Sequence, residues 1–162
     1  MLSGVPCRRV SQSKCHGAEL VGPGDLLRPW EQVVGWSSIP TEASWTVIQN
    51  ARLAVLDAEF AQRASRFPEI GSQLVGRALV RSRYLAILLA ITSQRRIESR
   101  LTMLFWHLAD RFGQVRGEWV EIPIPLTHSI LSEPAAARRP SASTALSCLQ
   151  EKGGVVRDGR RG

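Results

Sequence analysis

Cysteine is scarce in this chain of 162 residues. Cys7, Cys15 and Cys148 make an odd number and form no CxxC pair. Disulfide frameworks and structural zinc sites both need paired or clustered cysteines, so this count argues against both. Cys7 and Cys15 are also too few and too far apart to hold an iron–sulfur cluster. We therefore expect a reducing compartment, no metal and no cofactor.

Membrane-spanning runs and catalytic motifs are missing too. The apolar run at residues 85–91, LAILLAI, is too short to cross a membrane, and arginines flank it. No signal peptide is found, so a cytoplasmic protein is expected. The sequence contains no set of nucleophile, base and orienting group, no cluster of metal ligands and no glycine-rich phosphate loop. An enzyme is not predicted.

Lysine is nearly absent, and arginine carries the positive charge. Lys14 and Lys152 are the only lysines among 21 cationic residues, which face 14 acidic residues and give a net charge of +7. The guanidinium group binds phosphate and guanine through two parallel hydrogen bonds. This charge favours a polyanionic partner, although a modest basic excess is also common in soluble proteins.

Residues 126–150 predict two short helices joined by a tight turn. Thr127 suits the N-cap of the first helix, and Pro134 is expected to end it. Pro140 fits the first turn of the second helix, because the N–H that it lacks would have no partner there. The second helix places Ala142, Ala145, Leu146 and Leu149 on one face and Ser143, Thr144 and Ser147 on the other. Such a polar face can enter a major groove, and a solvated helical hairpin is the alternative.

Two longer helices are predicted before this pair. Residues 69–92 contain no proline and carry a stripe formed by Leu74, Ala78, Leu85, Leu88 and Thr92, typical either of a core helix or of a dimer seam. Residues 93–96, SQRR, form a polar hinge. The helix at 97–111 has a core-facing stripe, and residues 115–117 and 119–124 then predict a β-hairpin.

The N-terminal third favours short strands. Residues 1–18 are polar and show no clear periodicity, so their opening is expected to be frayed or a remnant of a larger domain. A strand, a Gly-Pro-Gly-Asp bend and a second strand are expected between residues 19 and 30. Residues 44–48 and 51–57 predict two further strands, followed by a short helix near residues 59–68.

The segments RLTMLFWHLADRFGQV, GEWVEIPIPLTH and ARRPSASTAL resemble the C-terminal half of the Crp/Fnr (cyclic-AMP receptor protein / fumarate-nitrate regulator) family of bacterial transcription factors. The resemblance extends from about residue 19 to about residue 156. It implies an α+β fold with a partial β-roll sensor of the cyclic-nucleotide-binding type at 1–68, a dimerisation helix and hinge at 69–93, and a winged helix-turn-helix at 94–162. About sixty residues of the roll and the returning wing strand are expected to be missing.

The same resemblance implies a transcriptional regulator that binds near-palindromic double-stranded DNA as a homodimer, with RNA polymerase as a possible further partner. Arg139 and Thr144 would read bases, with Ser143 in a secondary role. The expected phosphate contacts are Thr127, His128, Arg138 and Ser141. The alternative is a truncated subunit that dimerises but does not bind DNA.

Four positions depart from the family pattern. Relatives that bind cyclic nucleotides hold the ribose with a glutamate and the phosphate with an arginine, where this chain has Arg28-Pro29 and Glu42-Ala43-Ser44. A carboxylate would repel the phosphate, so cyclic AMP is not expected to bind and any effector stays undefined. Pro134 and Ala136 stand where relatives show an apolar residue and a turn glycine. If the turn needs a positive φ, alanine costs on the order of 1 kcal/mol there.

Overall fold

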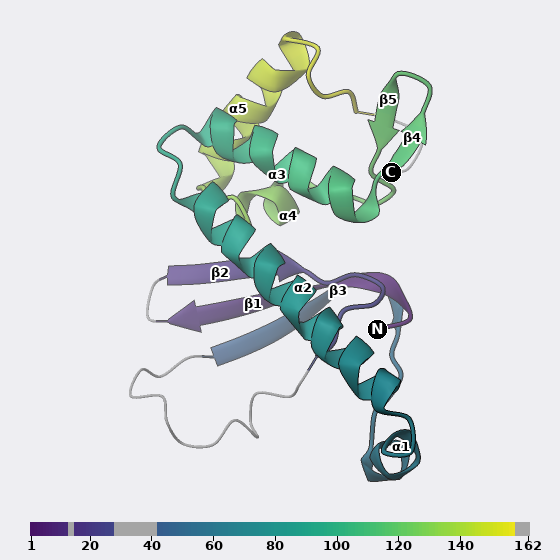
Figure 1. The fold of residues 1–162 in the computed structure, drawn as a ribbon. Helices are drawn as coiled ribbons and strands as arrows, with labels where there is room; N and C mark the ends of the chain where they lie inside the picture. The colour runs from purple at the N-terminus through teal and green to yellow at the C-terminus, as the bar shows by residue number, and fades with distance from the viewer. Residues whose placement is uncertain (13–14, 28–41, 158–162) are drawn as a thin grey trace.

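The computed structural model describes residues 1–12, 15–27 and 42–157, which form a mixed α and β fold (Figure 1). The first three strands, β1 (Ser3–Gln12), β2 (Cys15–Leu20) and β3 (Glu42–Arg52), make an antiparallel sheet in the order β2-β1-β3. In its register Cys7 of β1 lies opposite Leu20 of β2 and Thr46 of β3. The expected α+β fold class is confirmed.

Residues 3–12 and 15–18 form β1 and most of β2, which corrects the expectation of a frayed opening. No alternation is visible because four consecutive residues of β1, Val5 to Arg8, are buried, and one of them is charged. Arg8 is buried and pairs with the equally buried Glu19 across the two strands, with Nε and Oε1 2.6 Å apart. A strand that buries an arginine shows no simple apolar-polar pattern. The glutamate that pairs with this arginine lies on the next strand, too distant in sequence to be inferred locally.

Two further strand predictions were wrong in detail. Residues 44–48 and 51–57 do not form two strands, because β3 runs without a break to Arg52 and residues 53–57 have no regular structure. After the Gly-Pro-Gly-Asp bend, Leu26 and Leu27 are not in a strand either, and the remainder of that prediction, with Arg28 and Pro29, falls outside the described residues.

Two helices follow the sheet as expected. Asp57 caps the short α1 (Ala58–Ala64), where its Oδ1 accepts a hydrogen bond of 2.8 Å from the Phe60 N–H. Pro68 opens α2 (Pro68–Thr92), a helix of 25 residues that crosses in front of the sheet (Figure 1). Within the described parts of the chain, no helix is long and apolar enough to span a membrane.

The C-terminal part contains α3 (Ile97–Phe112), β4 (Gln114–Arg116), β5 (Trp119–Glu121), α4 (His128–Ser132) and α5 (Arg139–Glu151). The predicted hairpin is present, although its second strand ends at Glu121 and not at residue 124, and Gly117 takes a φ of 62° in its turn. The winged helix-turn-helix expected at 94–162 has no wing strand at residues 155–157, which lack regular structure, and residues 158–162 lie outside the described part of the chain.

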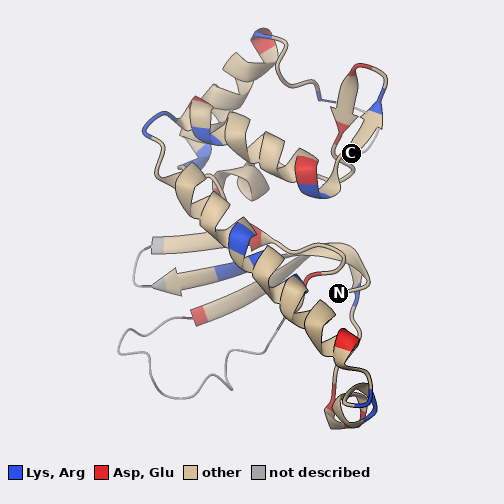
Figure 2. Ribbon diagram, viewed as in Figure 1, with Lys and Arg blue, Asp and Glu red and all other residues tan. Residues whose placement is uncertain are grey.

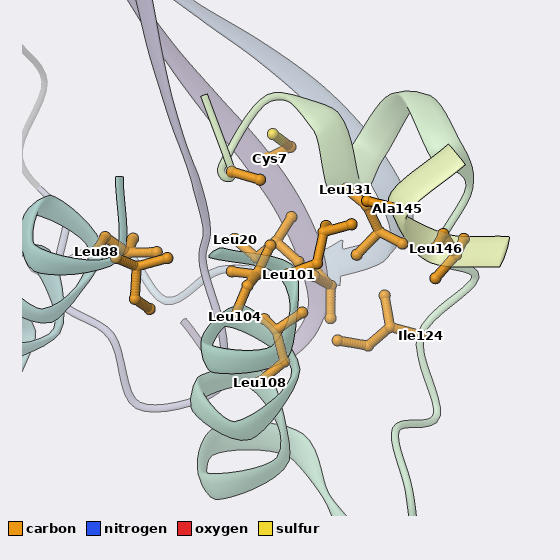
Figure 3. Close-up of a cluster of buried hydrophobic side chains, with 13 residues drawn as sticks. Cys7, Leu20, Leu88, Leu101, Leu104, Leu108, Ile124, Leu131, Ala145 and Leu146 are labelled. Carbon is orange, nitrogen blue, oxygen red and sulfur yellow. The ribbon is translucent and has the colours of Figure 1, made fainter. Parts of the chain in front are cut away.

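A single hydrophobic core joins the sheet, α2 and the C-terminal helices (Figure 3). It includes Cys7 and Leu20 from the sheet, Leu88 and Ile91 from α2, Leu101, Leu104 and Leu108 from α3, Leu131 from α4, and Ala145 and Leu146 from α5. Two hydrogen bonds also link the N-terminal part to the C-terminal part. Arg111 of α3 donates to the Leu20 carbonyl at 2.7 Å, and Gln49 of β3 donates to the Pro123 carbonyl at 2.9 Å. The helix-turn-helix is therefore held against the sheet as well as against α3.

Candidate nucleic-acid interface

The first helix of the motif begins where the sequence predicted. Thr127 has extended backbone angles, and its Oγ1 accepts a hydrogen bond of 3.2 Å from the Ile130 N–H. Leu131 is buried in the core, which fixes the inner side of α4. The Thr127 hydroxyl is exposed, and because it serves as the acceptor in the cap, its proton remains available to a phosphate oxygen.

The first motif helix ends at Ser132 with Glu133 as its C-cap, directly before Pro134, as expected. Glu133 keeps helical angles of −69° and −54°, and the Ala135 N–H still donates to the Leu131 carbonyl at 3.3 Å, so the chain continues as a helical turn past the last residue of α4. The turn is closed at Ala136, which has a φ of 47°. The N–H groups of Ala136 and Ala137 donate to the carbonyls of Glu133 and Ser132, each at 2.9 Å, which is the hydrogen-bond pattern of a Schellman motif. The positive φ that the turn was suspected to need is confirmed.

Arg100 of α3 holds this turn from outside, and the sequence analysis missed it. Its Nη1 donates to the Ala136 carbonyl at 2.9 Å and to the Ala135 carbonyl at 3.4 Å. Its Nε donates to the carbonyl of Gln94, in the loop between α2 and α3, at 2.6 Å. All three acceptors are main-chain oxygens, so no side-chain pattern in the sequence could have revealed the contact.

The second helix presents the polar face that its spacing predicted. Ala142, Ala145 and Leu146 are buried, and Arg138, Arg139, Ser141, Thr144 and Ser147 are exposed, with Ser143 half-buried beside them. Thr144 Oγ1 donates to the Pro140 carbonyl and Ser147 Oγ to the Ser143 carbonyl, both at 3.2 Å. These protons are committed to the helix, so the two hydroxyl oxygens face outward as acceptors for base or backbone donors.

The two arginines at the start of α5 carry free charge. Among the residues that the structure describes, neither Arg138 nor Arg139 forms an ion pair. Glu133 is instead engaged by Arg9 of β1, and the hydrogen bond between them raises the pKa of Arg9. Glu98 lies 3.5 Å from Lys152 at the other end of α5. His128 is half-buried in the first turn of α4, on the side of the motif where a phosphate contact was expected.

The predicted dimer seam mixes two sides of α2. Ala78 and Leu85 are exposed, Leu74 and Thr92 are half-buried, and Leu88 lies in the chain's own core, so Leu88 is not available to a partner. The outer side contains further exposed apolar side chains that the prediction omitted, namely Val75, Leu79 and Leu89. The sequence could not separate the two sides because α2 is apolar around most of its circumference.

No group of three or more His, Cys, Asp or Glu side chains that could hold a metal ion is found in the described part of the chain. The interface therefore consists of guanidinium groups, hydroxyl groups and main-chain atoms, which suit the hydrogen-bond acceptors and phosphates of nucleic acid.

No family model matches the chain. It is 37% identical over 87 residues to the regulatory protein CysR of Synechococcus elongatus. This match covers 51% of the chain and 42% of CysR, so the chain spans less than half the length of that relative.

Among solved structures the chain resembles TTHB099, a transcriptional regulator of the CRP family from Thermus thermophilus, with 17% identity and a TM-score of 0.60. The likeness covers 98% of this chain and 78% of TTHB099. It also resembles CprK (C200S) complexed with OCPA, with 14% identity, a TM-score of 0.59, and coverage of 94% and 69%. The resemblance indicated by the motif residues is thus confirmed in three dimensions: this chain has the fold of the Crp/Fnr regulators.

Proposed function

We propose that this chain is a transcriptional regulator of the Crp/Fnr type that binds near-palindromic double-stranded DNA as a homodimer. The observation that carries the proposal is the outward face of α5, where two arginines that have no ion pair within the described chain precede a row of exposed hydroxyl groups. Arg139 and Thr144 read base edges and Ser143 assists them. Thr127, His128, Arg138 and Ser141 contact phosphates and fix the register of the helix in the groove.

The outer side of α2 supports the dimer. Val75, Leu79 and Leu89 are 60%, 66% and 72% exposed, and with Ala78 and Leu85 they form an apolar surface that we call the outer stripe. Exposed side chains of this kind along a helix of 25 residues suit a second copy of the same helix. A two-fold axis along α2 would present two copies of α5 to successive major grooves.

Fluorescence anisotropy with a selected duplex and a random duplex, at two salt concentrations, tests the DNA proposal. Arg139→Ala should weaken binding to the selected duplex by about 1 to 3 kcal/mol and relax the preference at one base position, because a bidentate contact with guanine is lost. Arg138→Ala should lower the affinity for both duplexes by the same factor. Arg66→Ala is the matched control, because Arg66 is exposed beside α1, at the opposite end of α2.

A second candidate is a subunit that dimerises without binding DNA, favoured by the outer stripe, which needs no helix-turn-helix to associate. In that case the protein would sediment as a dimer, and both duplexes would bind equally weakly in the unaltered chain. Equal losses on both duplexes for Arg139→Ala and Arg138→Ala would contradict the assignment of Arg139 as a base reader.

A further inference from the structure

Several arginines of the described chain outside the helix-turn-helix have no carboxylate partner, and two of them are adjacent in one loop. Arg95 and Arg96 occupy the loop between α2 and α3, and both are exposed. Within residues 1–12, 15–27 and 42–157, neither of them forms an ion pair. By contrast, Arg8, Arg9, Arg63, Arg81, Arg111 and Arg116 each have a carboxylate partner. The loop therefore carries two positive charges that the described protein does not neutralise.

Arg100 brings this loop beside the start of α5. Its guanidinium group donates to Gln94, the residue before Arg95, at 2.6 Å, and to Ala136, two residues before Arg138, at 2.9 Å. One side chain therefore ties the loop to the turn of the motif. In Figure 2 the Lys and Arg colour marks the loop at the end of α2 and the neighbouring entry to α5, so the positive groups gather at one corner of the molecule.

We propose that Arg95, Arg96 and Arg138 form a ridge that binds the phosphate backbone of duplex DNA next to the groove that α5 enters. The inference rests on the proposed function and extends its footprint to the loop between α2 and α3. Neighbouring like charges repel one another, and an anion that bridges them removes this cost. Each guanidinium group binds phosphate oxygens through two parallel hydrogen bonds, and a row of backbone phosphates can engage several such groups at once.

The position of the ridge favours DNA over an acidic protein. It adjoins Arg139 and the hydroxyl face of α5, and duplex DNA carries about one charge per 1.7 Å of its axis, so a duplex seated on α5 would place further phosphates at its flank. Contacts of this kind fix orientation and carry no sequence information. The ridge should therefore add affinity and salt dependence equally for every sequence.

The salt dependence of binding tests the ridge. Arg95→Gln combined with Arg96→Gln should lower the slope of log affinity against log salt by about 2 per subunit, since each lost phosphate contact removes about 0.9. The selected and the random duplex should both bind about tenfold more weakly at moderate salt. The charge-preserving pair Arg95→Lys and Arg96→Lys should keep the wild-type slope, and Arg66→Gln should change nothing. Urea unfolding of each variant verifies that the fold is intact.

A double glutamine variant with an unchanged slope overturns the ridge. So does a loss confined to the selected duplex, which would mean that the loop acts through the position of α5, or competition by poly-glutamate as strong as that by random DNA. If Arg139→Ala still weakens the selected duplex in the same assays, only the ridge fails and the proposed function stands. If the unaltered protein binds neither duplex, both fail.

Discussion

Helices α2 and α3 meet at the loop that carries Arg95 and Arg96, yet they use their apolar residues differently. In α3, Leu101, Leu104 and Leu108 are buried on one side, as expected for an amphipathic helix that packs against the core with one face. In α2, Ile91 is buried while Leu89, two residues earlier, is 72% exposed. A helix that is apolar around most of its circumference needs cover on two sides. The chain covers the inner side, and we infer that a second copy covers the outer stripe.

The two helices also differ in what they fix. The far end of α3 is bound to α2 by an edge-on contact between His107 and Tyr84, with ring centres 5.5 Å apart, and by Arg111 lying 4.4 Å above the Tyr84 ring. At its other end Arg100 holds the turn of the helix-turn-helix. Helix α3 therefore links the position of α2 to the face of α5 that we propose contacts DNA, and α2 carries the surface that we propose for the partner.

The largest expected effect separates buried from exposed apolar side chains on these helices. Leu101→Ala on α3 and Ile91→Ala on α2 should each lower the free energy of unfolding by about 2 to 5 kcal/mol, because each leaves a cavity in the shared core. Leu79→Ala in the outer stripe should change it by less than about 0.5 kcal/mol when measured at a concentration too low for association. Urea unfolding gives all three values, and a loss for Leu79→Ala as large as for Ile91→Ala would contradict the comparison.

The next effect concerns association. Leu89→Glu places an unpaired carboxylate in the outer stripe, and burial of that charge in a dimer should weaken association by about 100-fold without unfolding the chain. Trp106→Glu on α3 is the matched control, since Trp106 is also an exposed apolar residue, at 65%. Sedimentation across a range of concentrations measures both. A wild-type chain that stays monomeric at high concentration would end the dimer proposal.

A smaller effect is expected at the turn that α3 supports. Ala136→Gly should raise the free energy of unfolding by about 1 kcal/mol, because glycine adopts the positive φ of 47° without the clash that alanine suffers. Ala137→Gly is the control and should lower it by about 0.4 to 1 kcal/mol, since no positive φ is needed there and the unfolded chain gains freedom. Thermal melts compare the two, and a loss of stability in Ala136→Gly would show that the turn is not strained.

The smallest effect lies at the contact between the two helices. Burial lowers the pKa of His107 and the nearby Arg111 lowers it further, against an opposing effect of Asp110. The folded chain therefore prefers neutral His107, and the unfolded chain takes up the proton first as pH falls below about 6.5. Stability should be fully present above that pH and decline as pH falls toward the lowered pKa of the folded state.

Urea unfolding at about pH 7.5 and about pH 5.5 measures this contribution. His107→Gln should reduce the difference between the two conditions. If His107→Gln leaves the difference unchanged, protonation of His107 is not the cause.

The sequence by itself determined the helices and much of the motif. The stripe of α3, the Thr127 cap, the inner and outer faces of α5 and the β4–β5 hairpin were all predicted, because each depends on residues within a few positions of one another. The condition set for Ala136, a positive φ, is met, and it was raised by the glycine that the resembling family shows at this position.

Only the tertiary structure decided the rest. Strands β1 and β2 depend on the buried pair of Arg8 and Glu19 and on a partner strand more than thirty residues away, so local periodicity could not find them. Which side of α2 faces inward depends on where the sheet and α3 lie, and this moved Leu88 from the predicted seam into the core. Arg100 binds main-chain carbonyls 36 residues away, and a carbonyl belongs to every residue type, so the sequence contains no mark of a contact that the fold alone creates.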